Sequence, residues 1–382
     1  MKWKVPFFDL QLGDEEKEAV CAVLDSNWIT AGPRIAEFEM EFAVAIAENV
    51  VAVAVSSATA ALHLSLLAMD IGPGDEVIVP SLTFVACANA IRYVGAIPVF
   101  ADITSPDNWN ISVDDVERKI TPRTKAVMLV HYAGYPCDMA GFLELAKRHD
   151  LEIIEDCSHA PLAQHQKGPV GTYGAAGCFS FFSNKNMTTG EGGMVVTRSP
   201  EIAERLRILR SHGITASTYQ RFKGHAYGYD VAELGFNYRL DEIRAALGIQ
   251  QLRKLHKYNS LRKGLVSAYR ALLVQELPQV TAPFADHPGE SSYHIFPVLM
   301  PVGAERRDAI IKAMGDAGIQ CSMHYRPIHT FTAYEEFVAD VPVTESIAGS
   351  IITLPLFPSL TEEQMRLVVG TLSQCLSECV PS

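Results

Sequence analysis

The chain has 382 residues, of which 44 are acidic and 32 basic, and its formal net charge is −12. At roughly 150 residues per domain, this length allows two or three domains with a large core. Hydrophobic residues make up 48% and charged residues 20%, which excludes a disordered, collagen-like or low-complexity chain. The acidic balance argues against non-specific binding to nucleic acid or to an acidic membrane surface.

Targeting and membrane signals are not apparent in the sequence. Residues 1–9 lack the apolar core and small-residue cleavage site of a signal peptide. The nearest apolar run, 50–55, is only long enough for a strand, far below the length of a membrane-spanning helix. The eight cysteines form no CxxC pair, so we expect free thiols in a reducing compartment. These features predict a cytoplasmic globular enzyme with no nucleic-acid or membrane partner.

The first half of the chain alternates between helical and strand-like patterns. Acidic residues open a helix at 14 that ends near 26, and helical spacing resumes over 35–47. Strand-like runs then occupy 51–55, 76–79, 97–101, 125–130 and 151–155, separated by helical patterns at 58–68, 84–93, 112–119 and 139–148. Strands joined by crossover helices imply a mostly parallel sheet that is covered on both faces.

The pattern changes in the second half of the chain. Strand-like runs at 176–182 and 193–197 precede a helix at 200–211 and a longer helical region from about 240 to 273. Beyond the proline-containing connection 278–288, we expect strands at 293–299 and 319–323 and helices at 303–316 and 361–378. The sequence therefore predicts an α/β fold, with a three-layer large domain over 1–255 and a smaller α+β C-terminal domain over 256–382.

Ligands of parallel α/β sheets bind at the carboxyl ends of the strands, so the segments that follow strands are informative. At 55–62 a strand runs into a helix start whose free N–H groups favour an anion, although N-capping by Ser57 or Thr59 would need no ligand. Asp156 ends an apolar strand, where it could hold a proton on a heterocyclic nitrogen or cap the next turn. A Cys157–His159 catalytic dyad is a weaker alternative, because residues two apart on a strand need not touch.

Two further segments carry candidate groups. An aromatic strand leads to Lys185, which burial or neighbouring cations would make nucleophilic, and Ser180 offers a hydroxyl to a phosphate; a solvated loop lysine is the alternative. In 234–240, Asn237 and Arg239 could bind phosphate or carboxylate, or could cap the following helix. An anion cradle, a carboxylate for a ring nitrogen and a lysine for an aldehyde are together what pyridoxal 5′-phosphate (PLP) needs.

The chain resembles the sugar-nucleotide aminotransferases of the DegT/StrS type, within the fold-type-I PLP enzymes of the aspartate aminotransferase superfamily. The resemblance covers nearly the whole chain. It is carried by Ser-Ser-Ala-Thr-Ala-Ala-Leu at 56–62, Gly-Pro-Gly-Asp-Glu-Val-Ile at 72–78, Pro-Ser-Leu-Thr-Phe at 80–84, Glu-Asp-Cys-Ser-His-Ala at 155–160, Phe-Ser-Phe with Lys-Asn and Gly-Glu-Gly-Gly at 179–193, Asn-Tyr-Arg at 237–239, His-Tyr-Arg-Pro-Ile-His at 324–329 and Leu-Pro-Leu-Phe-Pro at 354–358. The related dehydratases replace the lysine with histidine, so Lys185 disfavours sugar dehydration.

The resemblance implies roles for individual residues. Lys185 would form the imine with PLP and move the substrate proton, while Asp156 would pair with the pyridine nitrogen. Phe84 would stack on the ring and His159 would contact its hydroxyl. The implied cofactor-binding set is Ala58, Thr59, Phe84, Asp156, His159, Ser180, Lys185 and Asn237, the last reaching across from a second subunit of an obligate homodimer. The implied substrate set is Thr30, Arg34, Arg239, His324, Tyr325 and His329, with packing as the alternative for the histidines; no metal is expected.

The implied reaction is a two-step transamination. L-Glutamate would leave as 2-oxoglutarate, and a keto group on a nucleotide-linked deoxysugar would then accept the nitrogen. Amination at C4 is preferred to C3, because Ser-Ser-Ala-Thr at 56–59 and His-Tyr-Ala-Gly at 131–134 resemble the runs of C4 enzymes. A keto-inositol acceptor and a PLP-dependent lyase remain alternatives. A non-catalytic sensor is disfavoured because Lys185 and Asp156 are both present.

Overall fold

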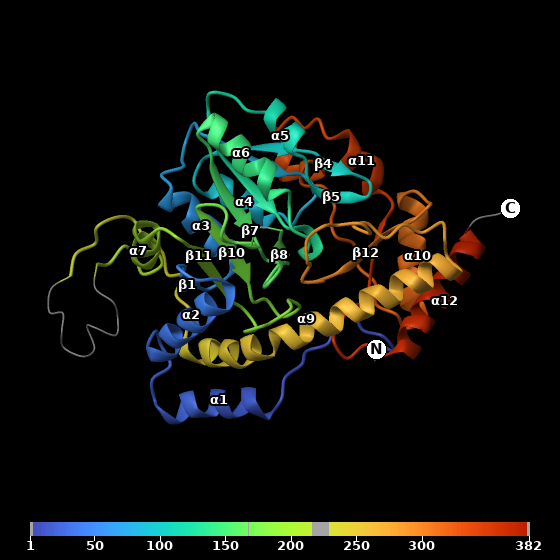
Figure 1. The fold of residues 1–382 in the computed structure, drawn as a ribbon, viewed down its shortest axis with the longest axis horizontal. Coiled ribbons are helices and arrows are strands. Elements are labelled where there is room, and N and C mark those ends of the chain that lie inside the picture. Colours follow the sequence, from blue (N-terminus) through green and yellow to red (C-terminus); the bar gives the residue numbers. More distant parts are fainter. Residues whose placement is uncertain (1–2, 167, 216–228, 380–382) are drawn as a thin grey trace.

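The computed structural model describes residues 3–166, 168–215 and 229–379 (Figure 1). Its helices are α1 (Asp14–Asp25), α2 (Pro33–Ile46), α3 (Ala58–Ala68), α4 (Ala86–Tyr93), α5 (Val113–Arg118), α6 (Met139–His149), α7 (Pro200–Leu209), α9 (Glu242–Glu276), α10 (Ala304–Asp316), α11 (Pro342–Ala348) and α12 (Glu362–Cys379). Its strands are β1 (Val51–Val55), β2 (Glu76–Pro80), β3 (Ile97–Ala101), β4 (Ile103–Ser105), β5 (Asn108–Ile111), β6 (Thr124–Val130), β7 (Glu152–Asp156), β8 (Gln164–His165), β9 (Gly168–Pro169), β10 (Ala176–Ser180), β11 (Gly193–Thr197), β12 (Phe296–Leu299) and β13 (Ile351–Leu354).

A seven-stranded sheet forms the centre of the molecule, in the order β1-β11-β10-β7-β6-β2-β3. The pairs β10–β7, β7–β6, β6–β2 and β2–β3 are parallel, whereas β11 runs antiparallel to both of its neighbours. The loop after β10 returns the chain directly into β11, and a direct return of this kind produces an antiparallel pair. The predicted mostly parallel α/β sheet is confirmed.

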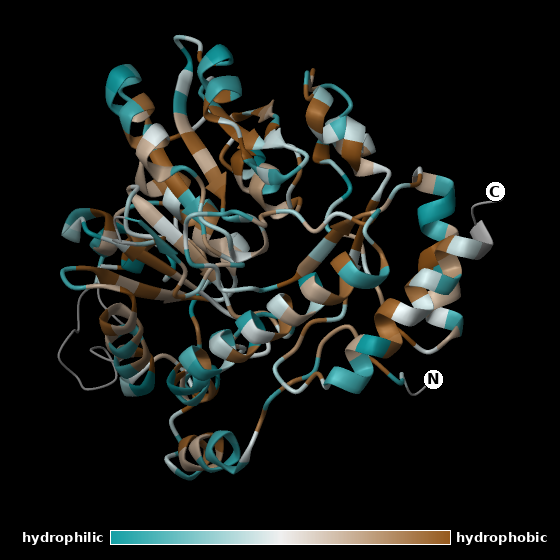
Figure 2. Cartoon of the chain, turned by 45° about the vertical axis from the view of Figure 1, so that its right-hand side comes forward, coloured by the Kyte–Doolittle hydropathy of each residue, from teal (hydrophilic) through white to brown (hydrophobic). Residues whose placement is uncertain are grey.

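Helices cover both faces of this sheet because its residues alternate between two apolar cores. Val53 and Val55 of β1 belong to a core shared with α3, α4 and α7. Ala52 and Ala54, the intervening residues, belong to a second core shared with α2 and the first half of α9. A further core lies under α5 and α6. Hydrophobic residues gather on the central strands (Figure 2). The sheet with helices on both of its faces forms the predicted three layers.

The C-terminal part of the chain packs around its own core. The antiparallel pair β12–β13 lies with α10, α12 and the second half of α9, and Val5 joins this core from the N-terminal segment. The predicted strand at 319–323 is wrong, since Ile319 and Ser322 form only isolated bridges. β12 pairs with 351–354, a run that the sequence interpretation had not assigned to a strand. The predicted domain boundary at 255 falls inside α9, a single 35-residue helix, and stays a prediction.

Two other global features bear on the sequence interpretation. Within the described ranges, no helix combines the length and apolar character needed to cross a bilayer. Cys21, Cys87, Cys137, Cys157, Cys178, Cys321 and Cys375 are free thiols, as expected.

Candidate active site

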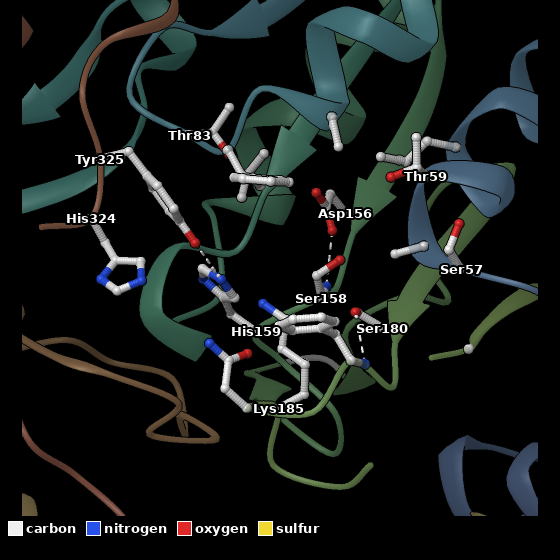
Figure 3. Close-up of a pocket in the computed structure, with 18 of the residues that line it drawn as sticks. Ser57, Thr59, Thr83, Asp156, Ser158, His159, Ser180, Lys185, His324 and Tyr325 are labelled. Carbon is white, nitrogen blue, oxygen red and sulfur yellow. Dashed lines mark hydrogen bonds between the residues drawn. The ribbon is translucent and has the colours of Figure 1, made fainter. Parts of the chain in front are cut away.

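A cavity of about 340 Å³ lies where β1, β2, β7 and β10 end, at the carboxyl edge of the parallel strands (Figure 3). Parallel sheets place ligands at this edge because the loops that follow the strands converge there. Nine of the residues predicted for the site line this one cavity. They are Ala58, Thr59, Phe84, Asp156, His159, Ser180, Lys185, His324 and Tyr325.

The N-terminus of α3 forms one wall. Ser57 caps the helix by accepting a hydrogen bond from the Ala60 N–H at 3.1 Å, so the capping interpretation of this residue is confirmed. Ala58 and Thr59 occupy the first helical positions, where backbone N–H groups have no partner within the helix. Together with the Ser180 hydroxyl at the end of β10, these groups provide donors suited to a phosphate.

Asp156 is the last residue of β7 and is 5% exposed. One carboxylate oxygen accepts the Ser158 N–H at 2.9 Å, and the other accepts the Cys87 thiol at 3.1 Å. A carboxylate has about four acceptor positions, so both oxygens retain capacity for a donor in the cavity. Burial and the charge of Asp156 raise the pKa of Cys87, which keeps Cys87 a neutral donor.

Lys185 follows β10 and reaches the same cavity from the strand next to Asp156 (Figure 3). Burial lowers the pKa of Lys185 from its ordinary value to about 8, while the negative charge of Asp156 acts in the opposite direction. A lysine with this pKa is partly unprotonated near neutral pH and is therefore available as a nucleophile or base. The alternative of a solvated loop lysine does not describe this environment.

His159 and Tyr325 meet in the lining of the cavity, with the tyrosine hydroxyl 2.9 Å from His159 Nε2 (Figure 3). The other ring nitrogen of His159, Nδ1, is buried and has no hydrogen-bond partner among the described residues. Burial, together with the charge of Lys185, holds the pKa of His159 well below its usual range, so its imidazole is neutral. A buried neutral imidazole with one unused nitrogen is suited to a polar ligand atom in the cavity.

Several predicted residues lie outside this cavity. Asn237 is exposed and is bridged to Ser211, and Thr30 is also exposed. The Arg34 guanidinium pairs with Glu37 at 2.7 Å on the surface of α2. Arg239 lines a separate cavity of about 390 Å³ beside α2 and α7. None of these four residues lines the cavity that the nine residues above share.

His329 also lies apart from the cavity. Its Nδ1 is 2.6 Å from the Ser81 hydroxyl, and its Nε2 lies 3.4 Å from a Glu345 oxygen. These contacts match the packing alternative for this histidine. His324, in contrast, lines the cavity and its Nδ1 is 3.0 Å from the Thr353 hydroxyl.

The structure adds residues to the site that the sequence interpretation did not assign to it. Most of them lie near assigned residues or in the same motifs, namely Ser57, Thr83, Ser158, Phe182, Asn184, Glu191 and Gly192. Position within the same motifs could have identified these neighbours. His294, whose Nε2 is 3.5 Å from the Lys185 Nζ, lies 109 residues away in sequence and carried no motif signal.

The Cys157–His159 dyad does not form, because His159 is engaged with Tyr325 and burial raises the pKa of the Cys157 thiol well above its usual range. Cys157 instead lies near His131 and Glu155, an arrangement with metal-binding residue types. His131 is already saturated, since its Nδ1 accepts the Cys137 N–H and its Nε2 bonds Glu155. This cluster is therefore a structural hydrogen-bond network.

The cavity fits PLP on features of its own. The unused Nδ1 of buried His159 lies beside a lysine with a lowered pKa and a carboxylate with free acceptor positions. Phe84, although a large apolar side chain, is 56% exposed and lines the cavity, as a residue that covers a flat ring would be. Phosphate donors at the start of α3 complete the set of groups that this cofactor requires.

Comparison with known proteins agrees with this chemistry. Residues 10–373 match the DegT/DnrJ/EryC1/StrS aminotransferase family. GDP-perosamine synthase of Escherichia coli O157:H7 is 38% identical over 379 residues, covering 98% of this chain and 99% of that protein. The protein Spr1654 of Streptococcus pneumoniae has been solved in its pyridoxamine phosphate (PMP) and PLP forms. Its structure matches this chain with a TM-score of 0.90 at 28% identity, covering 100% of both chains. Helicobacter pylori PseC, an aminotransferase involved in the biosynthesis of pseudoaminic acid, has a TM-score of 0.89 at 30% identity, covering 99% of this chain and 100% of its own.

The family match spans nearly all of the chain, and nine of the residues predicted for the site line one cavity. The chain therefore belongs to the DegT/DnrJ/EryC1/StrS aminotransferase family and is a PLP-dependent sugar aminotransferase.

Proposed function

We propose that the protein transfers the amino group of L-glutamate to the keto group of a nucleotide-linked deoxysugar, with C4 as the aminated carbon. The observation that carries the proposal is the convergence of Asp156, Lys185 and the start of α3 in one cavity. The similarity to a protein named GDP-perosamine synthase supports a nucleotide-linked sugar as acceptor. The preference for C4 rests on the resemblance of residues 56–59 and 131–134 to the corresponding runs of C4 enzymes.

Within this proposal, each residue has a chemical task. Bound PLP supplies an electron sink that stabilises negative charge at the substrate carbon. Asp156 holds the proton of the pyridine nitrogen, because an adjacent buried carboxylate favours the cationic ring. Lys185, with its lowered pKa, would act as the base that takes the proton from the substrate carbon and as the acid that later gives it up.

The remaining cavity residues bind and orient. Ala58, Thr59 and Ser180 hold the phosphate, and Phe84 covers the ring. His159, through its unused Nδ1, contacts the ring hydroxyl, with Tyr325 holding the imidazole in place. His324 and Tyr325, which line the same cavity, would contact the acceptor sugar.

The proposal includes a homodimer with shared active sites. Asn237 would reach the phosphate of the other subunit, and Thr30, Arg34 and Arg239 would meet its sugar nucleotide. All four lie outside the cavity of their own chain, which is the arrangement that such sharing requires.

The test is the reaction in two halves. The PLP-loaded protein is mixed with L-glutamate alone, and we expect about one equivalent of 2-oxoglutarate per site with loss of the visible imine band. A 4-keto or a 3-keto deoxysugar nucleotide is then added, and NMR of the product locates the new amine. Formation of pyruvate or sulfide from cysteine, with no 2-oxoglutarate from glutamate, would favour a lyase. Exclusive use of the 3-keto sugar would refute C4 amination, and use of a keto-inositol alone would refute the sugar acceptor.

A further inference from the structure

His294 lies against the catalytic lysine from the C-terminal part of the chain. Its Nε2 is 3.5 Å from the Lys185 Nζ, and the residue is 3% exposed. None of the roles discussed above uses it. The contact joins residues 109 positions apart, so it exists only in the folded chain.

The hydrogen bonds around Asn186 determine which nitrogen of His294 carries the proton. The Asn186 side-chain nitrogen donates to the Ser292 carbonyl at 2.6 Å and to the Asn259 side-chain oxygen at 2.8 Å. A backbone carbonyl only accepts, so the Asn186 amide oxygen must be the atom that faces His294 Nδ1, at 2.9 Å. That oxygen also only accepts, and therefore Nδ1 carries the proton. The Nε2 of a neutral His294 thus presents a lone pair to Lys185.

The imidazole is also fixed in position. The backbone N–H of His294 donates to the Ala133 carbonyl at 3.0 Å, and the backbone carbonyl of His294 accepts from the Arg262 guanidinium at 3.2 Å. Its ring packs against the His159 ring, with centroids 4.4 Å apart. A side chain held at both ends of its backbone and along its ring keeps one orientation toward its partner.

We propose that His294 is a positioning residue for Lys185: its Nε2 accepts a hydrogen bond from the lysine amine and holds it in the cavity whenever the amine is free. This rests on the proposed role of Lys185 as the cofactor lysine. His294 contacts the amine and not the substrate, so it acts through Lys185. Asn186 acts one step further back, by keeping His294 in the tautomer that accepts.

The protonation state of His294 shows whether it only accepts a hydrogen bond from Lys185 or also takes its proton. Burial and the nearby Lys185, His159, Arg262 and His324 hold the pKa of His294 well below its usual range. His294 therefore orients the lysine amine by accepting its hydrogen bond and does not take a proton from it. Lys185 itself faces Asp156 and Cys87 as well as the histidines. A neutral acceptor stabilises the protonated amine, so removing the acceptor should lower the pKa of Lys185 further.

The test compares His294→Asn with His294→Gln. Asparagine retains a donor for Asn186 but is too short to reach Lys185, whereas glutamine can place an amide oxygen near the position of Nε2. The first measurement is the pKa of Lys185 in the pyridoxamine phosphate form of the protein, obtained from competitive acetylation at several pH values with peptide mass spectrometry. The second is steady-state kinetics with glutamate.

We expect His294→Asn to keep the imine band, to lower the pKa of Lys185 by about one unit and to reduce kcat about tenfold with little change in KM. His294→Gln should stay within about threefold of the unchanged protein. Asn186→Ala removes the acceptor that keeps the proton on His294 Nδ1. It should shift the pKa of Lys185 in the same direction, and it serves as the test if His294→Asn fails to fold. An unchanged Lys185 pKa in both His294→Asn and Asn186→Ala would overturn the proposal, as would a kcat loss in His294→Gln as large as that in His294→Asn.

The imine band of the Lys185→Ala variant distinguishes failure of the proposed function from failure of the proposed role of His294. If Lys185→Ala retains the imine band after loading with PLP, Lys185 is not the cofactor lysine, whatever the His294 variants do. If Lys185→Ala loses the band while the His294 and Asn186 variants match the unchanged protein, only the role of His294 is refuted.

Discussion

Asp156 is the parallel partner of Cys178 in the pairing of β7 with β10, and Lys185 follows Cys178 by seven residues, in the loop after the same strand. Since parallel neighbours end at one edge, the carboxylate and the lysine meet in one cavity. Burial lowers the pKa of Lys185 and the charge of Asp156 raises it. The resulting pKa lies close enough to neutral pH for the amine to act as a base.

Asp156→Asn should reduce kcat for the glutamate half-reaction by about 10²- to 10⁴-fold, because a neutral amide no longer stabilises the protonated ring. The substitution preserves shape and leaves an oxygen for Ser158 or Cys87. Stopped-flow absorbance with L-glutamate measures the loss. Cys87→Ser retains a donor to Asp156 and is the control, expected within about threefold. Equal rates for Asp156→Asn and the unchanged protein would exclude the ring-nitrogen role.

Uptake of PLP by the cofactor-free protein should depend on the protonation of Lys185. The pKa of this amine is lowered to about 8, and only the unprotonated form attacks the aldehyde. The rate of imine-band formation should therefore rise about tenfold per pH unit below this pKa and level off above about pH 8. A rate that climbs steadily toward the pKa of an ordinary exposed lysine would contradict the lowered value.

Glu155→Gln should destabilise the protein by about 3 kcal/mol. One oxygen of buried Glu155 accepts the Tyr173 and Gly174 N–H groups, and the other accepts from Gly171 and His131. A glutamine NH₂ at either position would face two donors, leaving buried groups unsatisfied. Urea unfolding measures the change. The matched control is Glu152→Gln, an exposed residue of the same strand, expected within about 0.5 kcal/mol.

Gly193→Ala should weaken PLP binding about tenfold or more, since the added methyl displaces the phosphate cradle. A Cβ at Gly193 would lie 2.5 Å from the Ser57 carbonyl carbon and 2.7 Å from the Ala58 nitrogen, at the start of α3. Fluorescence titration of the cofactor-free protein gives the dissociation constant. Gly370→Ala, where a Cβ meets nothing within 4 Å, should leave binding unchanged. Tight binding by Gly193→Ala would show that the α3 start does not hold the phosphate.

The proposed shared active site predicts complementation between two inactive variants. Lys185→Ala and Asn237→Ala should each show low activity alone. After unfolding and refolding together, half of the dimers are hybrids with one intact site, so about a quarter of the full activity should return. Sites built from one chain would give no recovery, because no chain in the mixture carries both residues. Analytical ultracentrifugation checks that the mixed sample is dimeric.

Much of this protein follows from local sequence. Alternating apolar strands and amphipathic helices predicted the parallel sheet, and the placement of Asp156, Lys185 and Ala58–Thr59 after strands predicted where they meet. Such predictions succeed because the carboxyl ends of parallel strands share an edge whatever the loops contain. The strand at 351–354, which pairs with β12, was not predicted, and the strand expected at 319–323 forms only isolated bridges. Whether such short runs become strands depends on which segment packs beside them.

Tertiary structure alone decided which side chains surround the lysine. Asn186 is next to Lys185 in sequence, but its bond to the Ser292 carbonyl, 106 residues away, is what orients it toward His294. Local patterns report the conformation and burial of a segment, whereas hydrogen-bond partners depend on which distant segment packs against it. The sequence by itself therefore determined the fold and the cofactor, and it predicted Asp156 and Lys185 as residues of one site. The folded chain determined the protonation and orientation of the groups that support them.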